Sequence, residues 1–561
     1  MQKPAINLAS EPLHEAEIVR TRKSRGRRRL PPIWVWVVFA ACAIGVIWIR
    51  RPETPDKAFA NVTTLILSFV AGMSLLVWFS FLSAFPRRTR LTPVILLVAL
   101  VASALALLRI DSVNGELVPA FRLRWSAKPD ELLGKAQTQR LPAGVDLSRT
   151  TESDFSQFLG PKRDASAPAE PIDVERPPKL LWKQKIGAGW SAFAVVGDFA
   201  VTLEQRGEEE LVTCYRASTG DLLWVYAAMA RHTSTLGGTG PRSTPTIHEG
   251  KVYALGATGL LHCLDGSTGR RLWERNLHKE YGLTEAEDLR NVAWGRAGSP
   301  LIVDKMVVVP AGGKPDRPPV SLVAYDKDTG KKIWEGGSRQ IAFASPCLTT
   351  IGGARQIVIV NEDNVTGHDP KTGKVLWAHP WPGTSNMDAN ASQAVPIGDD
   401  RLFVSKGYSG GASVFVVERK GDAWNTREIW NKKNILKTKF TNVAILNGFA
   451  YGLSDGILEC VNVADGERRW KRGRYGHGQV LRVGDVLIVQ AEIGEVALVE
   501  ASSERYVELM RFQAIEGKSW NNPALSGRRL LVRNGEEAAC YEFFAPKNVN
   551  PDSAQAANLR E

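Results

Sequence analysis

Polar and aromatic residues recur in the C-terminal two thirds of the chain, each just before a short apolar segment. Arg, Lys, His, Asn and Trp side chains gathered around one axis could bind an anionic or planar ligand. The set contains no pair of carboxylates, so it offers no obvious general acid and base for hydrolysis. The competing interpretation is a polar wall around a water-filled channel, with amides satisfying the backbone at strand ends. The candidates are Trp190, Arg242, Ser243, Trp294, Arg296, Asn390, Gln393, Lys439, Asn442, His477, Gln479, Trp520 and Asn521.

Other motifs resemble catalytic or metal-binding sites, but the residues around them do not fit those functions. GlyTyrSerGlyGly (407–411) matches GxSxG, but it lies between two strand-like segments, whereas a nucleophile elbow needs a strand followed by a helix. AspLysAspThrGly (326–330) begins like a calcium loop and lacks the later ligands. The eight His residues show no metal-binding spacing, and no two of the six Cys lie within three positions of each other. We therefore assign no catalytic and no metal-ligating residue.

A repeat supplies the elements that position the candidate set. In five copies a Gly stands four residues before a Trp, and two weaker copies end at Trp182 and Trp430. The copies recur every 40–61 residues, and each contains four short alternating segments separated by Gly, Asp or Asn turns. We expect the Gly to adopt a positive φ and the Trp to lie on the outermost strand, packed against the next unit. The repeat positions are Gly220, Trp224, Gly269, Trp273, Gly330, Trp334, Gly373, Trp377, Trp430, Gly466 and Trp470.

Four-stranded units of this length are the blades of a β-propeller. The sequence predicts an all-β, eight-bladed β-propeller with four-stranded antiparallel blades over residues 176–545. The last unit has only three strands, and we expect 179–186 to supply its fourth strand and so remove the open sheet edge. Seven blades is the alternative if the irregular fifth unit is miscounted. Cys214, Cys263, Cys460 and Cys540 fall at one equivalent position, as small buried strand residues would.

The N-terminal part of the chain predicts a membrane anchor. Uncharged runs at 31–49, 58–86 and 91–108 each reach the length of a transmembrane helix. The predicted organisation is a basic cytoplasmic tail (1–30), three transmembrane helices (31–110), a linker and lead-in (111–175), the propeller, and a C-terminal tail (546–561). Cytoplasmic placement of the Lys and Arg cluster in the tail and of Arg87, Arg88 and Arg90 puts the propeller in the periplasm of a two-membrane bacterium, anchored in its inner membrane.

The net charge of +12 comes mainly from the N-terminal part of the chain. Residues 1–130 carry 18 Lys and Arg against 8 Asp and Glu, which leaves 53 against 51 for the rest. A nucleic-acid-binding domain needs a basic face on the folded domain itself. We therefore expect no nucleic-acid partner.

The AxxxTGxxxW repeat resembles that of quinoprotein-type (PQQ-like) propellers, and GlnPheLeuGlyProLysArgAsp (157–164) resembles the lead-in of many bacterial members, with Leu159 in place of the usual Arg. The resemblance covers roughly 150–545. This family includes PQQ-dependent alcohol and glucose dehydrogenases and also the cofactor-free propeller lipoprotein of the outer-membrane β-barrel assembly machine. The dehydrogenases hold PQQ beside a disulfide of adjacent cysteines, with Ca²⁺ bound by Glu, Asn and Asp and a catalytic Asp. This chain has no adjacent cysteines, although some family dehydrogenases also lack that pair.

The resemblance therefore implies a membrane-anchored periplasmic propeller that binds a protein or envelope component, without catalysis and without a cofactor. The alternative is a PQQ-dependent or related small-molecule oxidoreductase that uses the propeller channel, with Ca²⁺. A sensor that signals through the three helices is a third possibility. The expected partners are the lipid bilayer, through the helices, and a periplasmic or envelope protein.

Overall fold

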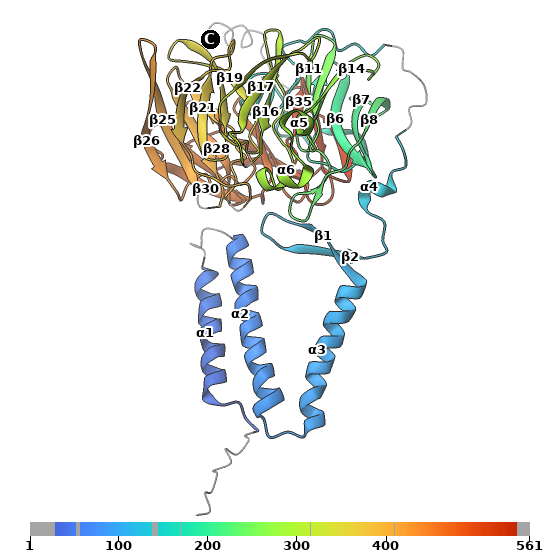
Figure 1. Cartoon of the computed structure of the whole chain (residues 1–561), viewed down its shortest axis with the longest axis vertical. Coiled ribbons are helices and arrows are strands. Elements are labelled where there is room, and N and C mark those ends of the chain that lie inside the picture. Colours follow the sequence, from blue (N-terminus) through green and yellow to red (C-terminus); the bar gives the residue numbers. More distant parts are fainter. Residues whose placement is uncertain are drawn as a thin grey trace, which may run out of the picture. The chain divides into compact units, whose positions relative to one another are not determined.

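The computed structural model describes residues 29–51, 57–136, 144–168, 170–314, 316–386, 388–408 and 410–546. The basic tail up to residue 28 and the C-terminal tail from 547 lie outside the described residues. The chain forms two compact units, the first comprising residues 1–52 and 62–107 and the second comprising 53–61 and 108–561. Figure 1 colours these from the blue helices to the red last blade.

Helices make up the described part of the first unit. They are α1 (Ile33–Ile49), α2 (Lys57–Val77, whose first turn belongs to the second unit), the π-helix η1 (Trp78–Leu82) and α3 (Arg87–Leu107). Lys57–Leu82 and Arg87–Leu107 are long and apolar enough to cross a membrane, with mean hydropathy 2.2 in each. The 17-residue α1 is shorter. Two candidate membrane spans are therefore found among the described residues where the sequence predicts three.

The second unit contains an eight-bladed β-propeller of antiparallel blades, as the repeat predicts. Blades 1–4 are β5–β8 (Ala194–Val196, Phe199–Arg206, Glu209–Arg216, Leu222–Met229), β11–β14 (Thr246–His248, Lys251–Leu255, Leu260–Asp265, Arg271–Asn276), β15–β18 (Leu301–Val303, Met306–Gly312, Val320–Asp326, Lys332–Gly336) and β19–β22 (Cys347–Ile351, Ala354–Val360, Asn364–His368, Val375–Pro380). Blades 5–7 are β23–β26 (Val395–Ile397, Arg401–Lys406, Gly411–Lys420, Ala423–Lys432), β27–β30 (Ala444–Leu446, Phe449–Ser454, Ile457–Asn462, Arg468–Arg474) and β31–β34 (Gln479–Val483, Val486–Gln490, Glu495–Glu500, Glu508–Gln513). Blade 8 is β35–β37 (Ala524–Ser526, Arg529–Arg533, Glu537–Glu542) completed by β4 (Lys179–Lys185).

The ring closes through an N-terminal strand, which confirms the prediction for this segment. β4 pairs antiparallel with β37, from Lys179 opposite Glu542 to Lys185 opposite Glu537. The outer edge of the last three C-terminal strands is thereby covered, and the ends of the propeller are joined by backbone hydrogen bonds.

In five blades the Trp of the outermost strand ties its blade to the Gly turn of the next one. The indole Nε1 of Trp224 donates to the Gly266 carbonyl at 2.9 Å, in the turn that ends at Gly269. Gly269 has φ +71°, and a Cβ there would lie 2.5 Å from the Trp224 ring. The absent side chain therefore makes room for the ring. The same pairing joins Trp182 to Gly220, Trp273 to Gly330, Trp334 to Gly373 and Trp430 to Gly466.

Trp377 departs from this pattern because blade 5 lacks a ThrGly turn. Its Nε1 donates instead to Gln356 Oε1 within its own blade, at 2.6 Å. Blade 5 replaces the turn with a long hairpin of two ten-residue strands, β25 and β26. The irregular unit is thus a complete blade, and the seven-bladed alternative is wrong.

The four equivalent Cys residues lie buried on the third strand of their blades. Each lies opposite the Trp of the fourth strand: Cys214 opposite Trp224, Cys263 opposite Trp273, Cys460 opposite Trp470, and Cys540 opposite Trp182. Their full burial raises the pKa of each thiol, to about 12 for Cys263. These residues serve as core packing.

The segment 111–175, expected to be a linker, carries structure in its described parts. It holds most of a hairpin of β1 (Leu108–Val113) and β2 (Pro119–Leu123), the short α4 (Pro129–Leu132), and β3 (Ser166–Ala167), which adds to blade 7 beside β31. Val145, Leu147 and Phe155 are buried in the propeller core. The segment has no sequence period because its residues fill gaps between blades that the repeat has already placed.

Candidate functional site

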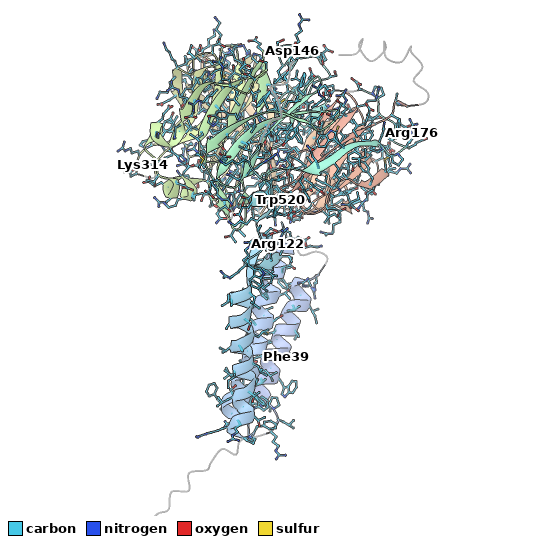
Figure 2. The ribbon with its side chains drawn as sticks, turned by 90° about the vertical axis from the view of Figure 1, so that its right-hand side faces the viewer. Phe39, Arg122, Asp146, Arg176, Lys314 and Trp520 are labelled. Atoms are coloured by element: carbon cyan, nitrogen blue, oxygen red, sulfur yellow. The ribbon has the colours of Figure 1, made fainter. Side chains whose placement is uncertain are left out.

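The candidate residues lie on one face of the propeller, in the loops that lead into the inner strands or, for Gln479, at the first residue of such a strand; these strands are β5, β11, β15, β19, β23, β27, β31 and β35. We call this the entry face. Figure 2 shows Trp520 on this face beside Arg122 of β2, with Asp146 on the opposite side of the propeller.

Aromatic rings follow one another around part of the entry face and form a collar. Trp520 lies between Trp190 and Phe440, with ring centroids 4.9 and 4.7 Å away. Phe440 in turn contacts His477 at 5.8 Å. Elsewhere on the face Trp294 stacks on Phe343 at 4.8 Å and approaches Tyr408 at 6.4 Å. These rings come from different blades, so the fold gathers residues that the sequence separates, by 37 positions for Phe440 and His477 and by 330 for Trp190 and Trp520.

Cations and one carboxylate stand among these rings. The Lys518 ammonium lies 4.1 Å from the Trp520 centroid and 5.1 Å from that of Trp190, and Lys439 lies 5.7 Å from Tyr408. Burial lowers the pKa of Lys518 to about 8 and that of Arg242 to about 9. Burial also holds the pKa of His477 well below its ordinary value, so this imidazole is neutral at pH 7.

Glu492, which the sequence analysis did not predict, is the hydrogen-bond acceptor at the centre of this group. It lies between β32 and β33, and its carboxylate accepts from the Trp520 indole at 2.9 Å and from the His477 backbone N–H at 3.0 Å. The predicted candidates precede the first strand of each blade, whereas Glu492 comes after the second strand of its blade. An acidic residue in the AlaGluIleGly turn before β33 was the only signal for it.

The turn of the β1–β2 hairpin docks on this group. The Gly115 N–H donates to Glu492 Oε1 at 2.7 Å, and the Gly115 carbonyl accepts from Lys439 Nζ at 3.0 Å. Lys518 Nζ donates to the Val113 carbonyl, also at 3.0 Å. Lys439, His477 and Trp520 of the candidate set therefore meet at a site that holds backbone groups of the chain itself.

The remaining candidates serve the architecture of the ring. Trp190 Nε1 and Arg242 both donate to the Gly237 carbonyl in the small hairpin of β9 (Thr233–Ser234) and β10 (Gly238–Thr239). Arg296 forms a buried two-pronged pair with Asp288 of α6 (Glu285–Asn291), at 2.9 and 2.7 Å. The other polar candidates bond to the backbone. Side-chain donors to backbone carbonyls are Ser243, Asn390, Gln393, Gln479 and Asn521, and the Asn442 side-chain oxygen accepts from the Gln393 backbone N–H.

The opposite end of the inner strands is crossed by the lead-in segment 155–167. Phe155 bridges to Val195 of blade 1, and the Ser156 carbonyl accepts from Ile247 of blade 2. The buried Arg163 donates to the Ser299 and Pro300 carbonyls of blade 3 at 3.0 and 2.9 Å. At its end, β3 pairs with β31 of blade 7. These thirteen residues contact the neighbouring blades 1, 2 and 3 and then blade 7, which lies across the eight-bladed ring from blade 3, so the segment passes across the axis of the ring.

The two sequence motifs set aside as turns lie in turns. The Asp326 carboxylate accepts from the Asp328 and Thr329 backbone and from the Thr329 hydroxyl at 2.8–3.1 Å, which lowers its pKa. The GxSxG match joins the antiparallel strands β24 and β25, and Ser409 itself lies outside the described residues. Within the described ranges no three His, Cys, Asp or Glu side chains group as a metal site.

Fold and repeat together define an eight-bladed propeller of the PQQ-like type. The chain belongs to the family described as outer membrane protein assembly factor BamB, whose profile matches residues 174–273 and 210–472. It is 23% identical over 266 residues to BamB of Yersinia pestis, which covers 45% of this chain and 60% of the relative. It is 25% identical over 174 residues to quinoprotein ethanol dehydrogenase of Pseudomonas putida, covering 28% of this chain and 26% of that protein.

Among solved structures, quinohemoprotein alcohol dehydrogenase from Comamonas testosteroni superposes with a TM-score of 0.52 at 12% identity, over 72% of this chain and 84% of that one. This likeness concerns the fold. The chain thus spans about a quarter of the quinoprotein ethanol dehydrogenase and 60% of the BamB relative.

The donor set of the entry face does not fit a Ca²⁺-bound quinone. Ca²⁺ takes six to eight oxygen ligands, mostly carboxylates and carbonyls. Here one carboxylate, Glu492, receives three N–H donors, and Lys439 and Lys518 stand beside the same turn. A divalent cation here would have to share this one carboxylate with the N–H donors, and the two nearby ammonium groups would repel it. We therefore derive no chemistry from bound Ca²⁺ and quinone.

Proposed function

We propose that this protein is a membrane-anchored propeller that binds a protein or another envelope component and has no catalytic activity. The observation that supports this most directly is the use of the entry face. Its charged residues bind peptide N–H and C=O groups of residues 113–115, which is the chemistry of a protein-binding surface. The name of the matching family, outer membrane protein assembly factor, agrees with such a role.

We further propose that α1, α2 and α3 all cross the bacterial inner membrane and that the propeller faces the periplasm. At 1.5 Å per residue, the 17 residues of α1 span roughly 26 Å, close to the hydrocarbon thickness. Arg87, Arg88 and Arg90 at the start of α3 would lie on the cytoplasmic side together with the basic tail. Three crossings then put the chain after Leu107 outside.

A quinoprotein oxidoreductase is the second candidate, supported by the 25% identity to quinoprotein ethanol dehydrogenase and by the cations and indole rings of the entry face. An anionic, planar quinone could contact Lys518, Trp190 and Trp520 once the Gly115 turn has left. The collar by itself is compatible with both candidates.

One experiment separates the two. The full-length protein in detergent is titrated with PQQ in the presence of Ca²⁺ by calorimetry and assayed for dye-linked oxidation of alcohols and aldose sugars. We expect neither saturable binding nor turnover. In parallel, a photo-crosslinking residue at Met229, which is 77% exposed, is expected to give a discrete adduct in cells, and the purified adduct partner should bind the protein in vitro. Turnover with PQQ would refute the proposal.

A further inference from the structure

The β1–β2 hairpin is held mainly through its turn, and its strands add one ion pair, in which Arg122 Nη2 of β2 lies 3.0 Å from Glu536 Oε1. Ile110 and Phe121, paired across the two strands, are 51% and 57% exposed. Val113 and Gly115 at the turn are buried. An isolated two-stranded hairpin is marginally stable in water. The contacts of its turn are therefore the main source of its fixed position against the propeller.

The propeller recognises this turn through charge-assisted hydrogen bonds to its backbone. Glu492 accepts from the Gly115 N–H, Lys439 donates to the Gly115 carbonyl, and Lys518 donates to the Val113 carbonyl. One side chain of the turn adds two contacts, since Glu116 Oε1 lies 3.4 Å from Lys57 Nζ and 3.6 Å from Arg474 Nη1. Backbone recognition with a single acidic side chain suits any turn of the same shape, whatever the rest of its sequence.

The turn itself is preorganised. Asn114 Oδ1 accepts from the backbone N–H groups of Glu116 at 3.0 Å and Val118 at 2.8 Å, as Asn does in tight turns. These bonds lie within the turn and need no propeller atom. A turn of AsnGlyGlu type therefore presents its backbone in the bound shape before it docks.

Glycine at the apex is required by the propeller and not by the turn. Gly115 is not in the left-handed region, so an L-residue could adopt its conformation. A Cβ there would, however, lie 2.2 Å from His477 Cδ2 and 2.6 Å from its Cγ. The new Cβ would also lie 2.9 Å from His477 Cβ, and the His477 backbone N–H is held by Glu492, so rotation of the imidazole alone does not remove the overlap. The entry face thus selects a turn whose apex has no side chain.

We propose that this group of residues is a binding site for a glycine-tipped turn followed by an acidic residue, that the chain's own turn 114–118 occupies it in the isolated protein, and that a partner protein binds by inserting such a turn in its place. The proposal rests on the protein-binding function proposed above. The tethered turn acts as a competitor of millimolar effective concentration. A partner must therefore add contacts elsewhere, which makes binding selective for proteins that carry the turn on a complementary surface.

The test uses the full-length protein in detergent and a cyclic peptide of residues 108–123, labelled with fluorescein, with binding followed by fluorescence anisotropy. Gly115→Val removes the internal competitor. Gly134→Val is the matched control, because a Cβ at Gly134 meets no atom within 4 Å and its φ is not positive. We expect the peptide to bind G115V at least tenfold more tightly than wild type or G134V. Adding E492Q to G115V, or placing Val at the apex of the peptide, should abolish binding.

A second measurement does not depend on a variant. Excess unlabelled peptide should accelerate hydrogen exchange of the Gly115 amide in the wild-type protein, because the displaced turn loses the Glu492 acceptor. Equal peptide affinity for G115V and G134V, together with unchanged exchange in wild type, would overturn the site. That result would leave a crosslinked partner of the propeller unaffected, whereas turnover with PQQ would overturn the protein-binding function whatever the peptide does.

Discussion

The contact between the repeat Gly and the Trp of the preceding blade makes a quantitative prediction for Gly220→Ala. Gly220 has φ +80°, and a new Cβ would lie 2.8 Å from Trp182 Cδ2. Placing Ala in the left-handed region costs about 1–2 kcal/mol. Ordinary carbon contacts lie at about 3.5–4.0 Å, so the indole must also shift by roughly 1 Å, and overpacking of this kind costs about 1–3 kcal/mol. We expect G220A to lose about 2–5 kcal/mol of the free energy of unfolding.

Gly398→Ala separates the two contributions. Gly398 also has a positive φ, +59°, but a Cβ there meets nothing within 4 Å. G398A should therefore lose only the backbone contribution of about 1–2 kcal/mol. In a Trp182→Ala background, which itself costs about 3–5 kcal/mol, G220A should cost no more than G398A.

The assay is urea unfolding of the full-length protein, with the β-sheet signal followed by far-UV circular dichroism. The quantity compared is the coupling between G220A and W182A, which we expect to be about 1–3 kcal/mol. A G220A loss equal to that of G398A, with no coupling to W182A, would show that the Gly is needed only for its backbone conformation. The account of how neighbouring blades interlock would then be wrong.

Three further substitutions test other features. Asp288→Asn leaves the buried Arg296 guanidinium without its counter-charge and should cost about 3–5 kcal/mol in the same assay, and a loss below about 1 kcal/mol would contradict the pairing. Arg163→Met removes the side-chain donor to the Ser299 carbonyl and one of two donors to the Pro300 carbonyl, which keeps the Thr246 hydroxyl, so trypsin should cleave after Lys162 faster than in wild type; an unchanged rate would mean that the lead-in is held by other contacts. Burial lowers the pKa of Lys518 from 10.5 to about 8. The unfolded chain therefore binds more protons above pH 8, and wild type should gain up to about 3 kcal/mol relative to Lys518→Met between pH 8 and 10.5. Parallel pH profiles of the two proteins would refute that assignment.

The propeller could be predicted from local sequence patterns because each blade repeats the same short-range rules. A Gly four residues before a Trp specifies a turn and an outer strand within one unit, and the copies then fix the number of blades. Blade 5 is the exception: it forms without the ThrGly turn, and Trp377 donates to Gln356 instead. The fourth strand of blade 8 was predictable because an unpaired edge needs a partner.

The site could be predicted only in part, for a physical reason. Gly115 and Glu492 are 377 residues apart, and their contact consists of one hydrogen bond that leaves no period in either segment. The candidate residues were selected because they precede the inner strands. This criterion identified Lys439, His477 and Trp520, but it also included residues such as Arg296, which forms an ion pair with Asp288. Position in a repeat indicates where a side chain lies, and its partner comes from whatever non-repeating segment fills the remaining space.

The two non-repeating segments of the second unit differ in a way that bears on function. The lead-in 155–167 is buried along much of its length and contacts blades 1, 2, 3 and 7, so removing it would take away the buried Phe155 and Leu159 and expose the blade residues packed against them. The β1–β2 hairpin keeps its apolar strand residues largely exposed and meets the entry face mainly through polar contacts of its turn. Undocking the hairpin therefore exposes little apolar surface, and the hydrogen bonds that it loses can be replaced by water or by an equivalent turn. The entry face is thus the end of the propeller at which a partner can exchange with the chain's own segment at small cost in free energy.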